Sequence, residues 1–298
     1  MPTPAVSICI PAYKAERYLA ETLASVRAQT FADWELIVTE DGSRDGTEEI
    51  VRVFAATVTQ TVRYLRHDPN RGLPATRNAG FEAARAPLVA LLDADDLWLP
   101  EHLAELVSLA DRSGADLVHA GSILFDNTTG RQISIRAPSP EVLASFPRSL
   151  FDSRYIIQPA SVMLTRALWA KVGGFAPAFR YVEDREMWLR CARSGARFAY
   201  TGRETCRYRK HPDALSARAP EMAEFSAEVL DQHLDWTEIP ESIRIDLAAD
   251  AWISAARLRQ RQQPRLAARH YGRACSLRWS FTCWLRGLLC RVLGLFYR

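Results

Sequence analysis

The sequence has only six cysteines, and none of them stands in a CxxC pair or in another grouping typical of a metal site. We therefore expect reduced, mostly buried thiols and a cytoplasmic protein. The first residues lack a basic stretch followed by a long apolar run, so we expect no signal peptide. No uninterrupted apolar run approaches the roughly 20 residues that span a bilayer. Internal repeats and low-complexity tracts are also missing.

Acidic residues are missing from the end of the chain. Residues 251–298 contain ten arginines and no Asp or Glu, whereas residues 1–250 contain all 35 acidic residues. The formal charges of the two parts are therefore +10 and −7, which predicts an acidic body with a basic appendage. The apolar share of 48% and the charged share of 24% are ordinary for a soluble globular enzyme or binding protein.

Short apolar, β-rich runs alternate with stretches of helical periodicity in the first half of the chain. The expected strands are residues 6–10, 36–39, 62–65, 88–92 and 117–124. Helices are expected at 18–26, 47–54, 73–84 and 101–109. This alternation predicts an α/β fold with a mostly parallel central sheet and flanking helices.

Polar and acidic residues follow three of the expected strands, in the turns PAYK, TEDGS and DADD. Ligands of parallel sheets collect beyond the carboxyl ends of the strands, so these turns should meet at one edge. Asp93, Asp95 and Asp96 repel one another beside a buried strand, which is costly unless a cation lies among them. Hard divalent ions choose carboxylate oxygens, and such an ion also neutralises a nucleoside diphosphate.

With these turns in place, the chain resembles the family-2 nucleotide-sugar glycosyltransferases, which have the GT-A fold. The resemblance covers about residues 5–216. The matching pieces, in the family's order, are VSICIPAYKAERYLAETLASVRAQTF, WELIVTEDGSRDGT, NRGLPATRNAGFEAA, PLVALLDADD, GGF, VEDREMWLRCARSG and YRKH. The resemblance implies a GT-A catalytic domain over residues 1–216, with a nucleotide-binding half over about 1–120 and an acceptor half over 121–216. A helical segment over 217–298 lies outside it.

The resemblance also implies the parts of a donor site. Asp95 would ligate Mn²⁺ or Mg²⁺, and Asp93 would hold a ribose hydroxyl or a water beside the metal. A further set of residues would contact the base and the phosphates: Pro11, Ala12, Tyr13, Glu40, Asp41 and Arg209. Arg77 would pair with a donor phosphate or with the acidic turn. Glu40 stands where the family usually has Asp and Lys14 where it often has Asn, so the base stays open, with a UDP-linked donor expected.

For the chemistry, the resemblance implies an inverting transfer with Asp184 as the base that takes the proton of the acceptor hydroxyl. Glu183 would bind sugar hydroxyls or orient the loop, and His211 would complete the metal shell or touch the pyrophosphate. The acceptor would be a hydroxyl of a glycan or of a lipid-linked glycan, as in cell-envelope polysaccharide synthesis.

Each of these assignments has a structural alternative that the sequence leaves open. The acidic residues of DADD, TEDGS and VED are also typical of turns and of helix N-termini. Tyr13 would then be a half-buried turn residue, Arg77 a salt-bridge partner within the fold and His211 a surface residue. Asp96 is expected only to support its loop or to cap the next helix.

The basic appendage mixes arginines with aromatic and aliphatic residues, notably from residue 277 onward. This composition suits a helix lying in the interface of a membrane with anionic lipids, at the inner face of the cytoplasmic membrane. A helical hairpin packed on the catalytic domain or on a second subunit of a homo-oligomer is an equal alternative. No motif supports nucleic-acid binding.

Two other functions remain open from the sequence. A sugar nucleotidyltransferase would bind a nucleotide and a metal on a similar sheet, but should carry a Gly-rich basic loop where this chain has PAYKAER. A non-catalytic nucleotide- or sugar-binding module should have lost one of Asp93, Asp95 and Asp184. The sugar, the acceptor and the linkage cannot be derived from these residues.

Overall fold

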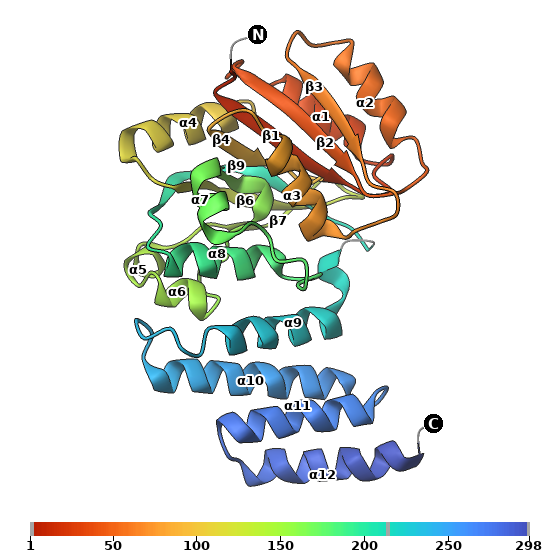
Figure 1. Cartoon of the computed structure of the whole chain (residues 1–298), viewed down its shortest axis with the longest axis vertical. Coiled ribbons are helices and arrows are strands. Elements are labelled where there is room, and N and C mark those ends of the chain that lie inside the picture. The colour runs from red at the N-terminus through yellow and green to blue at the C-terminus, as the bar shows by residue number, and fades with distance from the viewer. Residues whose placement is uncertain (1–2, 213–214, 297–298) are drawn as a thin grey trace. The chain divides into compact units, whose positions relative to one another are not determined.

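The computed structural model describes residues 3–212 and 215–296 (Figure 1). The contacts within the chain divide it into two compact units, which are described separately. The first contains the residues up to Ser145 together with Ser153–His211, and the second contains Phe146–Asp152 together with the residues from Pro212 onward. The division therefore falls after His211 rather than after residue 216, and a short stretch from the middle of the chain belongs with the C-terminal residues.

One nine-stranded sheet forms the centre of the first unit, in the order β3-β2-β1-β4-β8-β6-β9-β5, with β7 paired to β6. Its strands are β1 (Val6–Ala12), β2 (Trp34–Glu40), β3 (Val62–Arg66), β4 (Leu88–Leu91), β5 (Leu97–Trp98), β6 (Leu117–Asp126), β7 (Gln132–Arg136), β8 (Val162–Thr165) and β9 (Phe198–Lys210). Strands β1 to β4 are parallel, as the sequence predicts. Beyond them β5, β7 and β8 pair antiparallel with their neighbours, so the second half of the sheet is mixed.

Helices flank this sheet. They are α1 (Leu19–Arg27), α2 (Thr47–Ala55), α3 (Leu73–Ala83), α4 (His102–Ser113), α5 (Pro140–Ala144), α7 (Arg166–Val172) and α8 (Glu183–Arg193), with a 3-10 turn η1 at Pro159–Ser161. The first four match the helices expected from periodicity within a few residues at each end, since apolar side chains at helical spacing are buried against the sheet. Figure 1 shows them in red to yellow around β1 to β4.

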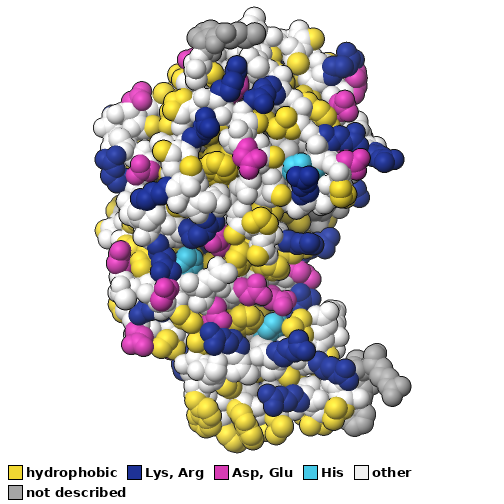
Figure 2. Space-filling view, in the orientation of Figure 1, with side chains coloured by type: hydrophobic (Ala, Val, Ile, Leu, Met, Phe, Trp, Pro, Cys, Tyr) yellow, Lys and Arg dark blue, Asp and Glu magenta, His cyan; other side chains and the backbone are white. Residues whose placement is uncertain are grey.

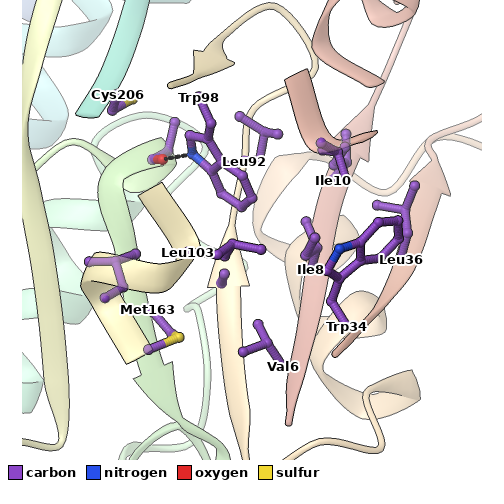
Figure 3. Packing of buried hydrophobic residues seen from close by; sticks show 14 of the residues in the cluster. Val6, Ile8, Ile10, Trp34, Leu36, Leu92, Trp98, Leu103, Met163 and Cys206 are labelled. Atoms are coloured by element: carbon purple, nitrogen blue, oxygen red, sulfur yellow. Dashed lines mark hydrogen bonds between the residues drawn. The ribbon is translucent and has the colours of Figure 1, made fainter. Parts of the chain in front are cut away.

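The core of the first unit lies between the parallel strands and their helices. Every residue of β1 and β2 is buried, which is typical of a parallel strand covered on both faces. Figure 3 shows Ile8, Leu36 and Trp34 packed together on these strands. Trp98 joins the same cluster, and its indole Nε1 donates a hydrogen bond of 2.6 Å to the carbonyl oxygen of Ala160.

The register of the parallel strands brings the predicted turns to one edge of the sheet. Ala12 at the end of β1 lies opposite Glu40 at the end of β2. On the other side of β1, the backbone N–H of Leu92 donates to the carbonyl oxygen of Cys9, which aligns the start of the DADD turn with the same edge. The three turns therefore meet, as expected for carboxyl ends of parallel strands.

The second unit is helical. Its elements are α6 (Arg148–Phe151), a 3-10 turn η2 (Leu215–Ala217), α9 (Ala219–Gln232), α10 (Glu241–Arg259), α11 (Pro264–Leu277) and α12 (Phe281–Phe296). Helix α9 contacts α10, α10 contacts α11, and α11 contacts α12. Small residues and two aromatic side chains, Trp252 and Tyr271, form its buried cluster. No helix of the described ranges is both long and apolar enough to cross a membrane.

Candidate active site

The acidic turn after β4 separates its three carboxylates, and each has its own partner. Asp93 accepts a hydrogen bond of 2.7 Å from Arg77, and Asp95 lies 2.9 Å from Nε2 of His211. The carboxylate of Asp96 accepts from the backbone N–H of Arg209 at 2.8 Å. The repulsion expected within the turn is therefore offset by cationic and N–H groups from distant parts of the chain.

Asp96 is the buried member of the turn, with only 1% of its surface exposed. Burial raises the pKa of its carboxyl well above the ordinary value, and the neighbouring charges of Asp95 and Asp93 add to this. Its Oδ2 has no hydrogen-bond partner among the described residues. Such a group favours the neutral form and supports the loop rather than binding a ligand.

Arg209 holds the acidic turn from the end of β9. Its guanidinium donates to the carbonyl oxygen of Asp95 at 2.7 Å, to Asn127 at 2.9 Å and to Glu21 at 2.6 Å. The group also lies 4.9 Å from the ring centroid of Tyr18, and the residue is 5% exposed. These contacts make Arg209 a clamp on the turn. Its contact with a leaving diphosphate remains a prediction.

Arg77 connects the acidic turn with the second half of the unit. It lies in α3, is 2% exposed, and forms ion pairs with both Asp93 and Glu183. Although burial opposes it, the charges of these two carboxylates raise the pKa of the guanidinium. The planar fork of arginine suits such a bridge because its N–H groups reach two carboxylates at once.

The second pair of acids begins α8. Val182, directly before it, has a left-handed backbone with φ of 53°, which is strained for a β-branched residue and turns the chain so that Glu183 and Asp184 start the helix. Burial raises the pKa of Glu183 to about 7, although Arg77 opposes the shift. Burial also raises the pKa of Asp184, again against Arg77. Two carboxylates that titrate above their usual range beside one arginine are typical of catalytic sites.

The GGF turn is fastened to α3 by Asn78, the residue after Arg77. The side-chain amide of Asn78 accepts from the backbone N–H of Phe175 and donates to its carbonyl oxygen, both at 2.8 Å. The ring of Phe175 lies under Arg77, 5.4 Å from its guanidinium carbon. Gly174 has φ of +72°, and a Cβ there would lie 2.7 Å from Oδ1 of Asn78, so only glycine fits without displacement.

A second fastening of this turn comes from α8 and was missed by the sequence analysis. Arg190 donates to the carbonyl oxygens of Val172 and Gly174, and it forms two hydrogen bonds with Glu186 one turn earlier. Glu186 is 2% exposed. The i, i+4 spacing of the two residues is visible in the sequence and is a possible signal, but it is also ordinary for an exposed helix face.

The acids of the TEDGS turn are held by backbone N–H groups. Glu40 accepts from the N–H of Gly42 at 3.0 Å and of Ser43 at 2.6 Å, and is 1% exposed. Asp41 accepts from the N–H groups of Arg71 and Gly72, each at 2.8 Å. Although burial opposes them, these donors hold the pKa of Asp41 below its ordinary value. Both carboxylates therefore stabilise the turn, and recognition of a base by Glu40 remains a prediction.

The PAYK turn adds an exposed ring beside this edge. Pro11 and Ala12 are buried, whereas Tyr13 is 51% exposed. Lys14 has φ of 52°, and its N–H donates to the side chain of Ser43 at 3.1 Å, which ties this turn to the TEDGS turn. The ammonium of Lys14 lies 5.4 Å from the ring centroid of Tyr13. Packing of this ring on a base remains a prediction.

Asp95 and His211 are the pair best suited to hold a divalent ion. Asp95 is 34% exposed at its side chain, and Nδ1 of His211 is buried without a hydrogen-bond partner. The ranges described contain no group of three or more His, Cys, Asp or Glu residues arranged for a metal. The pair fits an ion that takes its remaining ligands from diphosphate oxygens and water, as Mg²⁺ usually does.

The mixed sheet and its flanking helices have the architecture of the GT-A fold. The model of the family described as "Glycosyl transferase family 2" matches residues 7–180. The chain belongs to this family and is a glycosyltransferase, as its motifs predicted.

Two curated relatives support this membership. EpsE of Bacillus subtilis (strain 168), which carries the name of a glycosyltransferase, is 29% identical over 219 residues, covering 72% of this chain and 77% of EpsE. The UDP-Glc:alpha-D-GlcNAc-diphosphoundecaprenol beta-1,3-glucosyltransferase WfgD of Escherichia coli is 29% identical over 124 residues, covering 42% of this chain and 48% of WfgD.

Solved structures share the fold. TarS 1-349 of S. aureus in complex with UDP-GlcNAc has a TM-score of 0.70 at 18% identity, with 98% of this chain and 88% of that chain covered. The mannosyltransferase PcManGT of Pyrobaculum calidifontis, in complex with GDP-Man and Mn2+, has a TM-score of 0.64 at 19% identity, with 100% of this chain and 82% of that chain covered.

Proposed function

We propose that the protein is a metal-dependent, inverting glycosyltransferase that moves a sugar from a UDP-linked donor to a hydroxyl of a glycan or of a lipid-linked glycan in cell-envelope polysaccharide synthesis. The observation that carries the proposal is the bridge made by Arg77. It joins Asp93 of the acidic turn to Glu183, next to Asp184. The groups that we propose for donor binding and for proton transfer would therefore be adjacent.

In the proposed reaction, the oxygen of the acceptor hydroxyl attacks the anomeric carbon of the donor sugar. Its proton passes to the carboxylate of Asp184, and the bond from the anomeric carbon to the diphosphate oxygen breaks on the opposite side. The raised pKa of Asp184 suits this role because a stronger base takes the proton more readily near neutral pH. Glu183, held by Arg77, would bind hydroxyls of the sugar.

Asp95 and His211 would hold Mn²⁺ or Mg²⁺, which would neutralise the charge of the departing nucleoside diphosphate. The solved complexes named above support a nucleotide-sugar donor, with UDP in one and GDP in the other, and Mn2+ is named in the second. The printed name of WfgD, which describes a UDP-Glc donor and a diphosphoundecaprenol acceptor, supports the UDP-linked donor and a lipid-linked acceptor. With such an acceptor, the protein would work at the inner face of the cytoplasmic membrane.

Release of nucleoside diphosphate from a panel of sugar donors, with Mn²⁺ and candidate acceptors present, tests the proposal. Asp95→Asn should lose metal-dependent nucleotide binding in calorimetry, whereas Asp184→Asn should bind the donor normally and lose turnover by about 10²–10⁴-fold. In the wild type, the pKa that governs the fall of kcat at acid pH should lie above 3.8, the ordinary value for Asp. Retained turnover of Asp184→Asn would remove it as the base, and pyrophosphate as product would indicate a nucleotidyltransferase instead.

A further inference from the structure

The last helix of the chain, α12, packs on α11 through small residues. Along α12 the buried positions are Cys283, Gly287, Cys290 and Gly294, at spacings of four, three and four. The two glycines let the helices approach closely, since a Cβ at Gly287 would lie 3.2 Å from Cβ of Tyr271. One narrow stripe of α12 is therefore used for packing, and it carries none of the large side chains.

The large apolar side chains of α12 point away from this stripe. They include Phe281 (60% exposed), Trp284 (48%), Leu285 (48%), Leu288 (43%), Leu289 (58%) and Leu295 (72%). Figure 2 shows hydrophobic side chains gathered along the lower edge, where Figure 1 places α12. A helix of a soluble domain normally buries its large apolar residues, and contiguous exposed patches of this kind mark an interaction site.

Two arginines border this apolar face. At about 100° per residue, the exposed apolar positions cover about half the circumference of α12, with Arg291 at one margin and Arg286 at the other. Both arginines are exposed, and within the described ranges no acidic side chain pairs with either. By contrast, Arg273 and Arg278 of the preceding segment pair with acids of α9 and α10. The basic charge at the apolar face is thus uncompensated.

We propose that the outward face of α12 docks on the surface of an anionic phospholipid bilayer. The helix would lie in the plane of the interface, with Trp284 and the leucines among the acyl chains and Arg286 and Arg291 at the phosphates. The charge favours this occupant over a second copy of the chain, because two such faces would bring four arginines together without an acid on either α12. The proposed function has the protein work at the cytoplasmic membrane, and the outward face of α12 is the surface that would bind there. Only the purpose of this binding rests on the proposed function.

Flotation of the full chain with vesicles tests the proposal. Vesicles of phosphatidylcholine alone and of phosphatidylcholine with phosphatidylglycerol are the two probes. The chain should float with the anionic vesicles, and added salt should weaken binding because it screens the arginines. The double variant Leu285→Gln/Leu289→Gln should bind about 10- to 100-fold more weakly. Arg286→Gln/Arg291→Gln should lose about 30-fold on anionic vesicles only.

The matched control is Val53→Gln/Ile133→Gln, which changes two apolar residues of similar exposure, 52% and 55%, in the first unit. It should float like the wild type. Equal flotation of the wild type and the leucine variant would overturn the proposal, as would a dimer in sedimentation that this variant abolishes. Nucleoside diphosphate release from a soluble donor should be the same in all four proteins, so failure of membrane docking and failure of sugar transfer give different results.

Discussion

Replacing Arg77 by methionine should destabilise the first unit in a pH-dependent way. The substitution keeps an unbranched side chain, although a shorter one. It removes the charge that, among the described residues, contacts both Asp93 and Glu183. Exposures of 2%, 22% and 7% for the three side chains leave little solvent to screen the loss. Removing one partner of a buried ion pair costs about 3–5 kcal/mol, which we expect at pH 8.

The sign of the pH dependence follows from Glu183, whose pKa burial raises from 4.5 to about 7. A carboxyl group whose pKa is raised by folding binds more protons in the folded state, so its contribution to stability is complete below pH 4.5 and is lost as the pH rises through 7. Arg77 lowers this pKa, so in the variant Glu183 should stay protonated up to a higher pH. Each unit by which the pKa of Glu183 rises in the variant adds about 1.4 kcal/mol to the loss of stability at high pH. At pH 5.5 Glu183 is mostly protonated in both proteins, so the loss should shrink to about 1–2 kcal/mol.

The loss of stability is measured by hydrogen exchange at increasing urea concentration. Peptides from α3 and α8 report on the first unit alone. Arg52→Met, which breaks an exposed pair with Glu49 on α2, is the control and should change nothing measurable. Arg77→Lys should be intermediate, because one ammonium cannot reach two carboxylates in fixed geometry. A loss for Arg77→Met that is below about 1 kcal/mol, or equal at both pH values, would refute the bridge as the source of stability.

The GGF turn gives two further predictions. Gly174→Ala should destabilise the first unit by about 1–3 kcal/mol more than Gly173→Ala in urea unfolding, because both have positive φ but only Gly174 has side-chain atoms within 3 Å of the added Cβ. Equal losses would show that the contact with Asn78 is relieved without cost. Asn78→Leu should cost about 2–4 kcal/mol by leaving the N–H and carbonyl oxygen of Phe175 unpaired, and Asn78→Asp should cost less because it restores the acceptor. Similar losses for the two variants would exclude these hydrogen bonds as the cause.

The parallel half of the fold was predictable because its signals are local. Buried strands such as β1 and β2 appear as continuous apolar runs, and α1 to α4 appear as apolar residues at helical spacing. By contrast β5 has two residues, too few for a pattern, and β7 is exposed at four of its five positions, so its two isoleucines do not mark a buried face. Strand β9 was not among the expected strands, since its polar and arginine-rich sequence does not resemble a buried strand.

The candidate site was predictable as a set of residues and not as a set of contacts. The motifs identify Asp93 and Glu183, and Arg77 was expected to pair with a donor phosphate or with the acidic turn. The two carboxylates are separated by 90 positions in the chain, and nothing in either motif shows that one arginine joins them. The same holds for Arg209, which donates to the carbonyl oxygen of Asp95 in the acidic turn and pairs with Glu21 near the N-terminus. Such contacts depend on how α3 and α8 pack on the sheet and on the position of β9 within it, which no local pattern encodes.

The partners within the acidic turn also limit where a metal would be needed. Asp93 shares the charge of Arg77 with Glu183, and the buried carboxyl of Asp96 favours its protonated form, so each has its charge reduced within the fold. Among the described residues, His211 is the partner of the Asp95 carboxylate, and this side chain is the most exposed of the three at 34%. The chain thus supplies positive charge to one end of the turn and leaves Asp95 as the carboxylate for which a divalent ion and a diphosphate would complete the charge balance.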